Sequence, residues 1–321
     1  MLRRRGLIAG LGLVLAALLV LLVPWFGAGP LAKETAFIVP DGSSLSGVAA
    51  KLEREGVISS ASGFRLRARL FGGGAPIRAG EFNLPKGASA SRVLAIIQGD
   101  EVMRRFITVP EGMPSIMVYE RLMAQQHLTG ELTVPAEGSV LPESYDFERG
   151  ESRQGVVLRM QAAMSRTLAE LWAKRGPDTV ARTPEEAVIL AAIVEKETGK
   201  PSERKTVAGL YSNRIRQGIM LQADPTIIYP ITRGKPLGRR IRQSEIQAIN
   251  DYNTYAMLGL PKGPITNPGR ASIEAVLHPA KTSALYMVAD GTGGHAFAAT
   301  LEEHNANVEK WFAIRRSRGE M

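Results

Sequence analysis

The sequence predicts an α+β protein: a single N-terminal transmembrane helix, a small α+β module, and a larger, mainly helical domain with a minor β-hairpin or sheet. Three observations predict it. An uncharged apolar run opens the chain, short strand–turn–helix patterns follow, and helical patterns dominate beyond about residue 102. With 321 residues and 45% hydrophobic content, the chain can form two globular domains. We expect boundaries that give residues 1–29, 30–101 and 102–321.

The first apolar run, residues 6–26, has the length of a membrane span. At about 1.5 Å per residue it would cross a hydrocarbon core of roughly 30 Å. The arginines at residues 3–5 favour a cytoplasmic N-terminus, and the aromatic residues 25 and 26 suit the far interface. A cleaved signal peptide is the alternative, but its apolar core is usually about 7–15 residues long. We therefore expect an uncleaved anchor, with the chain from Pro30 onward outside the cytoplasm.

Composition excludes several kinds of chemistry. The chain has no cysteine, which rules out disulfides, Cys-ligated zinc and thiol nucleophiles. Its four histidines do not have metal-motif spacing, and no phosphate loop or nucleophile elbow is present, so we expect no metal and no cofactor. His295 is the one histidine that we regard as a functional candidate. The net charge of +9 suits an anionic polymer or lipid headgroups, whereas nucleic acid is not expected outside the cytoplasm.

Three Pro-x-Gly sequences, at residues 40–42, 85–87 and 110–112, share one local pattern. Each follows an apolar lead-in and precedes apolar residues at helical spacing, which predicts a strand-to-helix corner. Their spacing along the chain is uneven. The pattern therefore indicates a small module with duplicated parts and not a solenoid.

The helix that follows residue 183 has the clearest boundaries in the larger domain. Thr183 is expected to cap it, Pro184 suits its first position, and Glu186 would complete a capping box. Residues 187–194 are all apolar, which predicts burial on every side. Ser202 is the expected cap of the next helix. Further on, ALYMVAD and HAFAAT around GTGG predict a hairpin, followed by a closing helix.

Two glutamates, Glu195 and Glu197, end this buried helix. At about 100° per residue they point roughly 200° apart, so they cannot form a carboxylate pair. Glu197 shares its face with Leu190, Ile193 and Val194, which places it at the edge of the core. Burial raises the pKa of a carboxyl group, and a raised pKa suits a general acid. A helix end that has simply reached solvent remains the alternative.

Downstream segments with poor periodicity carry amides, hydroxyls and aromatic rings, as a sugar-binding groove does. With the first glutamate of the pair they form our set of candidate substrate-binding residues: Glu195, Asn213, Arg214, Gln222, Asp224, Thr226, Tyr229, Tyr252, Asn253 and Tyr255. Such groups also form ordinary turns, so the set as a whole indicates a sugar-binding groove more strongly than any single member does.

Four stretches resemble the YceG-like endolytic murein transglycosylases: AAIVEKETGKPSERKTVAGLYSNRIRQGIMLQADPTIIYP, YNTYAMLGLPKGPITNPG, HPAKTSALYMVADGTGGHAF and LPESYDF. The resemblance covers nearly the whole chain and implies a LysM-like module before the catalytic domain. It places the catalytic glutamate in the E-K-E-T motif. The Glu-Thr pair is similar to the Glu-Ser pair of other lytic transglycosylases, which selects Glu197 over Glu195.

The resemblance implies an enzyme anchored in the bacterial inner membrane, with its catalytic domain on the periplasmic side. Its substrate would be peptidoglycan glycan strands, cut between N-acetylmuramic acid and N-acetylglucosamine to leave 1,6-anhydro ends. It implies no metal or cofactor, and peptidoglycan synthases are possible partners. Two alternatives remain open: a hydrolase that uses Glu197 with Asp224, and a wall-binding scaffold without activity.

Overall fold

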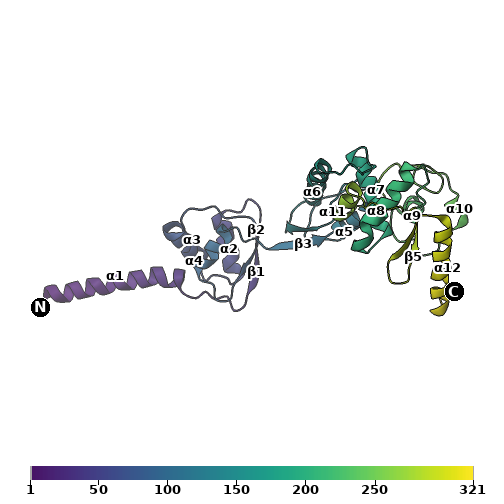
Figure 1. The fold of residues 1–321 in the computed structure, drawn as a ribbon. Coiled ribbons are helices and arrows are strands. Elements are labelled where there is room, and N and C mark those ends of the chain that lie inside the picture. The colour runs from purple at the N-terminus through teal and green to yellow at the C-terminus, as the bar shows by residue number, and fades with distance from the viewer. Residues whose placement is uncertain (1, 321) are drawn as a thin grey trace. The chain divides into compact units, whose positions relative to one another are not determined.

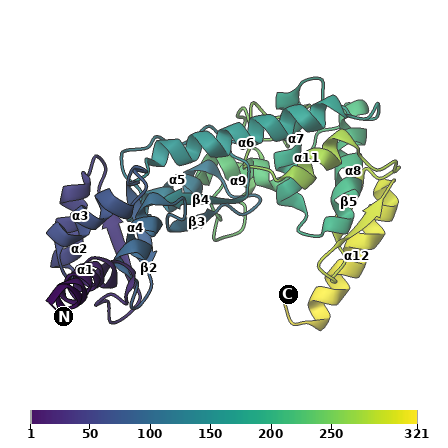
Figure 2. The same ribbon diagram turned by 90° about the vertical axis from the view of Figure 1, so that its left-hand side faces the viewer.

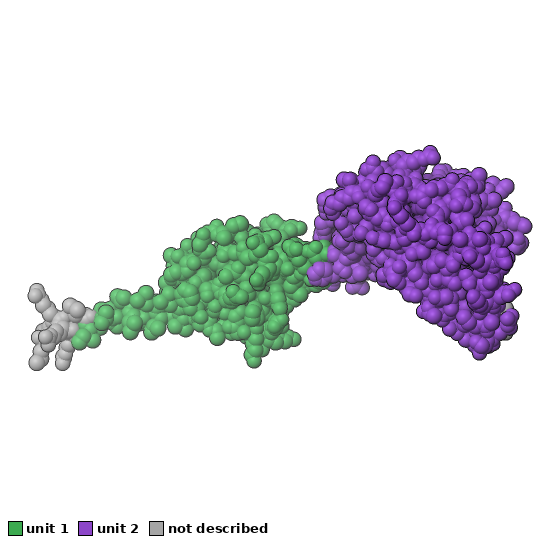
Figure 3. Space-filling view, viewed as in Figure 1, with its two compact units in different colours: residues 1–105, 146–150 green, residues 106–145, 151–321 purple. Residues whose placement is uncertain are grey.

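The structure, a computed structural model, describes the backbone of residues 2–320 and the side chains of residue 8 and residues 10–320. The chain divides into two compact units (Figure 3): unit 1 is residues 1–105 with 146–150, and unit 2 is residues 106–145 with 151–321. Helices predominate, and the strands of the described residues form three two-stranded sheets. The boundaries expected from the sequence at residues 29 and 101 remain predictions.

Unit 1 pairs two short strands and covers them with helices. Its elements are α1 (Leu2–Phe26), β1 (Thr35–Val39), α2 (Leu45–Arg54), α3 (Ala61–Phe71), β2 (Gly80–Leu84) and α4 (Ala90–Gln98). The strands are antiparallel, and Phe37 lies opposite Phe82. Both rings are fully buried and form a core with Leu52 and Ile97. Strands this short are stable because the helices bury their apolar face.

The three Pro-x-Gly corners are confirmed, and they have the same geometry. In each, the N–H of the residue after glycine donates to the proline carbonyl at 3.1–3.2 Å. The glycines lie in the left-handed region, with φ of 70°, 67° and 72° at Gly42, Gly87 and Gly112. Positive φ at this turn position favours glycine because a side chain would be strained there.

The expected transmembrane helix is contradicted. Within the described part of the chain, no helix is long and apolar enough to cross a membrane. The end of α1 belongs to unit 1, because Trp25 is 2% exposed and its ring lies 5.8 Å from that of Phe64. Arg67 also donates to the carbonyl of Leu21 at 2.8 Å. Trp25 is thus a core residue instead of a membrane-interface residue. The side chains of the arginines at residues 3–5 lie outside the described residues.

Unit 2 is mainly helical. The elements beyond unit 1's first segment are β3 (Arg104–Thr108), α5 (Ser115–Met123), β4 (Ser144–Glu148), α6 (Arg153–Ala173), α7 (Pro184–Glu197), the 3₁₀ turn η1 (Pro201–Glu203), α8 (Arg204–Arg216), α9 (Asp224–Thr232), α10 (Gln243–Ile246), α11 (Arg270–Leu277), β5 (Tyr286–Ala289), β6 (His295–Ala298) and α12 (Leu301–Ser317). The chain passes between the two units within β3 and β4. Both ribbon views show α7, α8 and α11 packed side by side (Figures 1 and 2).

The helix α7 is the centre of this packing. From residue 187 to residue 194 every side chain is buried except that of Ile189, which is partly buried, so the expectation of burial on all sides nearly holds. Thr183 accepts the N–H of Glu186 at 3.2 Å and caps the helix as expected. The Glu186 carboxylate instead accepts the N–H of Arg182, so the expected capping box is wrong.

The start of α8 also differs from the prediction. Ser202 lies within η1, and α8 begins at Arg204 with Glu203 in the capping position. Glu203 does not cap the helix, because its carboxylate binds His295. The predicted hairpin is confirmed: β5 and β6 pair antiparallel, with Tyr286 opposite Ala298. The closing helix is confirmed as α12, which packs along β5.

Candidate active site

A cavity of about 390 Å³ in unit 2 lies where α7 ends. Glu197, the last residue of α7, lines it. The remaining wall comes from α8, the segment before and at the start of α9, the loop at Tyr255, the hairpin and α12. We call this space the catalytic cavity, because it contains Glu197, the candidate catalytic residue of the sequence analysis. Segments far apart in sequence therefore converge on one carboxylate.

Burial controls the charge of Glu197. Burial and, to a lesser extent, the negative charge of Asp224 raise the pKa of its carboxyl group to about 7, against a hydrogen bond from Tyr211 and the charge of Arg214. The buried oxygen Oε1 has no hydrogen-bond partner among the described residues. A carboxyl group that titrates near neutral pH can both give and take a proton, as a general acid–base catalyst must.

Arg214 is a fixed positive charge beside this carboxyl. Its Nε donates to the carbonyl of Leu285 at 2.6 Å, and its Nη1 donates to the carbonyl of Leu221 at 3.0 Å and to Gln222 Oε1 at 3.2 Å. The guanidinium also lies 5.3 Å from the centre of the Tyr286 ring. These contacts use carbonyls and not carboxylates, so they leave the guanidinium its full positive charge. That charge lowers the pKa of Glu197.

Asp224 is the second acid of the catalytic cavity. It is the first residue of α9, and its Oδ1 accepts the Tyr255 hydroxyl at 2.6 Å. Burial, this hydrogen bond and the charge of Asp224 raise the pKa of Tyr255, which therefore stays a neutral donor. Just before Asp224, Gln222 has a φ of 53°, a left-handed conformation that is uncommon outside glycine. Such backbone is often found at functional sites, where the surrounding structure maintains it.

The predicted substrate-binding residues divide into two groups. Arg214, Gln222, Asp224 and Tyr255 line the catalytic cavity with Glu197. The others lie elsewhere in unit 2: Glu195, Asn213, Thr226, Tyr229, Tyr252 and Asn253. Tyr252 and Asn253 lie in a loop, where side-chain direction follows no regular repeat. The other four lie in α7, α8 and α9, and which face of each helix meets the cavity is decided by how the helices pack.

Three of the second group hold the backbone in place. The Asn213 amide donates to the carbonyl of Thr282 at 2.7 Å, ahead of the hairpin. The Thr226 hydroxyl lies 2.8 Å from that of Thr254, and both residues are fully buried. The amide of Asn253, also fully buried, donates to carbonyls at the end of α10. Polar groups satisfied inside the protein fix the loops that form the catalytic cavity.

The two tyrosines form a separate polar cluster. The rings of Tyr229 and Tyr252 lie 4.8 Å apart, and Tyr229 is hydrogen-bonded to Glu137. Glu137 in turn accepts the N–H of Ser115 at the start of α5. Burial raises the pKa of Glu137, against these hydrogen bonds. This carboxyl therefore caps a helix, and the tyrosines belong to its surroundings.

Glu195 anchors the end of α7 on the side away from the catalytic cavity. Its Oε2 accepts the N–H of Gly269 at 2.9 Å, and its Oε1 lies 3.4 Å from Nη2 of Arg204. The side chain is 5% exposed. The same guanidinium nitrogen lies 3.3 Å from Glu111. Glu195 thus fixes where α7 ends, which also fixes Glu197.

Sequence reasoning missed several residues that line the catalytic cavity: Tyr211, Tyr286, Met287, Leu301 and His304. Tyr211 lies three positions before Arg214 in α8, so helical spacing would have placed it on the same face. His304 had no such signal, because it comes from the last helix. Its ring stacks on Tyr286 at 5.3 Å, and burial followed by the charge of Arg214 lowers its pKa, so the imidazole is neutral.

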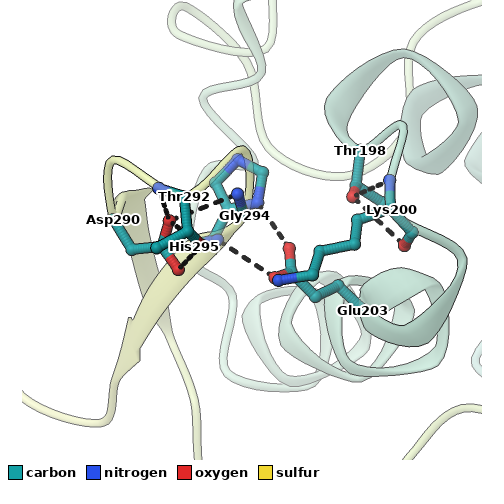
Figure 4. A network of polar contacts seen from close by, with 7 residues as sticks. All are labelled: Thr198, Lys200, Glu203, Asp290, Thr292, Gly294 and His295. Atoms are coloured by element: carbon teal, nitrogen blue, oxygen red, sulfur yellow. Dashed lines mark hydrogen bonds and ion pairs between the residues drawn. The ribbon is translucent and has the colours of Figure 1, made fainter.

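A polar network attaches the tip of the hairpin to the segment after Glu197 (Figure 4). His295 Nδ1 lies 2.9 Å from Glu203 Oε2, and the His295 N–H donates to Oε1 at 3.2 Å. Lys200 lies 3.2 Å from the same carboxylate. Burial opposes ionisation, but these contacts hold the pKa of Glu203 below its ordinary value. His295 therefore positions the hairpin, whose residue Tyr286 forms a cavity wall.

Two curated relatives are similar along most of the chain. The endolytic murein transglycosylase of Bacillus subtilis is 26% identical over 315 residues, which cover 87% of this chain and 85% of that protein. The enzyme of the same name from Streptococcus pneumoniae serotype 2 is 26% identical over 319 residues, 84% of this chain and 57% of that protein. This chain therefore spans little more than half of the pneumococcal relative.

A solved structure and a family profile agree with these relatives. The crystal structure of a yceG-like protein from Listeria monocytogenes is 25% identical, with a TM-score of 0.56 over 85% of this chain and 98% of that one. None of these names mentions a LysM module, so that expectation for the small module has no support. The profile of the YceG-like family matches residues 37–310, which include most of both units, and the chain belongs to that family.

Proposed function

We propose that this protein is a lytic transglycosylase that cleaves peptidoglycan glycan strands internally, with Glu197 as its catalytic acid and base. The observation that carries the proposal is one carboxyl group with a pKa of about 7 in a cavity whose walls carry tyrosines and a fixed arginine. The relatives named endolytic murein transglycosylases support the same reaction.

The reaction needs one acid because the substrate supplies its own nucleophile. Protonated Glu197 donates its proton to the glycosidic oxygen, and the bond from that oxygen to C1 of N-acetylmuramic acid breaks. N-acetylglucosamine leaves with a free 4-hydroxyl. The Glu197 carboxylate then takes the proton of the muramyl C6 hydroxyl as that oxygen closes on C1. The product is a 1,6-anhydro end, Glu197 is protonated again, and no water is consumed.

The catalytic cavity suits a sugar. Its volume of about 390 Å³ is in the range of small-ligand sites. Tyr255 and Tyr286 offer ring surfaces, and Gln222 offers an amide. Glu197 Oε1, which has no hydrogen-bond partner among the described residues, would carry the proton that Glu197 donates to the substrate. A polar oxygen left without a partner costs about 1–3 kcal/mol, which a bound substrate hydroxyl would recover.

A hydrolase is the second candidate, because Asp224 lines the same cavity. Retaining and inverting glycosidases both need two carboxyl groups. Two observations favour the transglycosylase. The Tyr255 hydroxyl occupies Asp224 Oδ1 at 2.6 Å, which weakens this group as a nucleophile or base. The charge of Asp224 also has a role without direct attack, since it raises the pKa of Glu197.

Product analysis tests the proposal. Purified glycan strands are incubated with the protein, and the new ends are identified by mass spectrometry. Anhydro ends that depend on Glu197 are the expected result. Reducing ends would indicate the hydrolase, and intact strands from a folded protein would indicate a binding protein without activity.

The substrate also implies a location. Peptidoglycan lies outside the cytoplasm, so we propose that unit 2 acts on the outer side of the bacterial cytoplasmic membrane, beside the synthases that make the strands. A protease added to spheroplasts should then digest unit 2. Protection of unit 2 until the cells are lysed would contradict this location.

A further inference from the structure

A second cavity, of about 460 Å³, lies across the same helix ends from the catalytic cavity. Neighbouring residues of the chain divide the two spaces. Lys196 lines the second cavity and Glu197 the catalytic one, and likewise Pro225 lines the second and Asp224 the catalytic one. The end of α7 and the start of α9 therefore form a shared wall. We call the second space the lysine pocket, after Lys196 and Lys235, which both line it.

The lining of the lysine pocket differs in chemistry from that of the catalytic cavity. Its surface is mainly aliphatic, with residues such as Met113, Met117 and Ile228, and no aromatic ring lines it. The catalytic cavity carries Tyr255 and other tyrosines. Sugars are generally held by ring stacking and by many hydrogen bonds, and the lysine pocket offers few of either. An aliphatic surface with ammonium groups suits methyl side chains and carboxylates instead.

The charges of the lysine pocket favour an anion. Its carboxylate, Glu111, is 3.3 Å from Arg204 and so is already paired. Lys235 pairs with Glu120, an exposed partner that lines neither space. Lys196 has no carboxylate within ion-pair distance among the described residues, and its Nζ reaches the Gly112 carbonyl at 3.5 Å. An ammonium group with so weak a partner is available to a ligand.

We propose that the lysine pocket receives the stem peptide of the muramic acid beside the cleaved bond. This inference rests on the proposed function. The stem peptide is a short chain with alanine methyl groups and free carboxylates, and it hangs from the lactyl group of the sugar. A muramyl unit in the catalytic cavity would send its peptide across the shared wall. The enzyme would then distinguish strands that carry peptides from strands that have lost them.

The test compares two substrates that differ in the peptide alone. One is glycan strands with stem peptides, and the other is the same strands after removal of the peptides by an amidase. The ratio of kcat/KM for the two substrates measures the preference, and we expect it to exceed one for the wild type. Lys196→Met should lower this ratio about threefold to fivefold, chiefly through KM, because a partly exposed ion pair is lost. Lys196→Glu should lower it further.

Lys174→Met is the matched control. Lys174 is an exposed lysine that pairs with Glu170, and it lines neither space. The kcat/KM ratio of the Lys174→Met variant for the two substrates should equal that of the wild type. Circular dichroism verifies that each variant is folded.

Two results would overturn the inference. One is a wild type without preference, and the other is an unchanged kcat/KM ratio in both Lys196 variants. If kcat/KM falls equally on both substrates, so that the ratio is unchanged, the pocket is a glycan subsite. If the wild type cuts neither substrate, the proposed function fails, and binding decides the inference separately. Free muramoyl peptide should then bind Glu197→Gln at least threefold more tightly than it binds the double variant with Lys196→Glu. Equal affinities would overturn the inference.

Discussion

Glu195 and Glu197 lie two residues apart at the end of α7 and have different functions because they face different surroundings. Glu195 accepts the N–H of Gly269 and contacts Arg204, so it fastens the helix to the start of α11. Glu197 faces the catalytic cavity, with Tyr211 as its hydrogen-bond donor. Residues two positions apart point roughly 200° apart around a helix axis, so the two carboxylates face different surroundings. One carboxylate positions the helix and the other is available for proton transfer.

Replacement of Glu197 by glutamine should abolish cleavage and leave the fold intact. General acid–base catalysis contributes about 10²–10⁴-fold, and this residue acts in both proton transfers, so we expect a loss near or above the upper value. Counting anhydro ends by mass spectrometry measures the loss. A folded variant that keeps a tenth of wild-type activity would exclude Glu197 as the acid.

Replacement of Glu195 by glutamine should affect stability more than chemistry. The change removes a buried charge partner of Arg204, which we expect to cost about 1–3 kcal/mol of unfolding free energy. Part of the activity should remain, because Glu195 does not line the catalytic cavity. Urea denaturation and the end-group assay measure both effects. If Glu195→Gln proves inactive while Glu197→Gln is active, we have assigned the wrong glutamate.

Stability and activity should both depend on pH through Glu197. Its pKa rises from an ordinary 4.5 to about 7 on folding, so the folded state holds this proton more tightly. The stabilisation is complete below pH 4.5 and is lost as pH rises to about 7, a change of about 3 kcal/mol. Glu197→Gln should remove this part of the pH dependence. The wild-type kcat/KM should also fall above about pH 7, because the acid is then ionised. An activity profile that is flat from pH 6 to 9 would argue against this assignment.

Asp224→Asn separates the two candidate reactions. The charge of Asp224 raises the pKa of Glu197, so its removal should shift the fall in activity to lower pH. Anhydro product should still form at the lower pH. Tyr255→Phe is the matched variant, since it removes the hydrogen bond and keeps the charge. Complete loss of turnover in a folded Asp224→Asn protein that still binds glycan would favour the hydrolase.

Glu203→Gln tests how the hairpin is held. The variant keeps the shape of the side chain but weakens the contact with His295, which is the bond that fixes the hairpin tip. We expect a higher KM and a loss of about 1–3 kcal/mol of stability. Glu274→Gln is the control, because Glu274 is an exposed glutamate with a long 3.9 Å contact to Lys205. Equal behaviour of the two variants would show that the network does not position the cavity wall.

Local sequence signals predicted the local structure well. The Pro-x-Gly corners were predictable because the left-handed turn position strongly favours glycine, as at Gly112. Thr183 and Pro184 marked the start of α7, and its apolar run marked its burial. Family membership was also predictable, because the motif around Glu197 is contiguous in the sequence. Each of these features depends on neighbours within a few residues.

Tertiary structure decided the rest. Burial of Trp25 depends on α3, some 40 residues away, so the apolar run alone could not show that this residue belongs to the core of unit 1. The same holds for the catalytic cavity, where His304 and Tyr286 reach Arg214 from the far end of the chain. Asn213 and Arg214 are adjacent in the sequence, yet one holds a loop and the other lines the cavity. The sequence selected Glu197 as the candidate catalytic residue, whereas its pKa and its neighbours arise from the packing of distant segments, because burial and charge act through space and not along the chain.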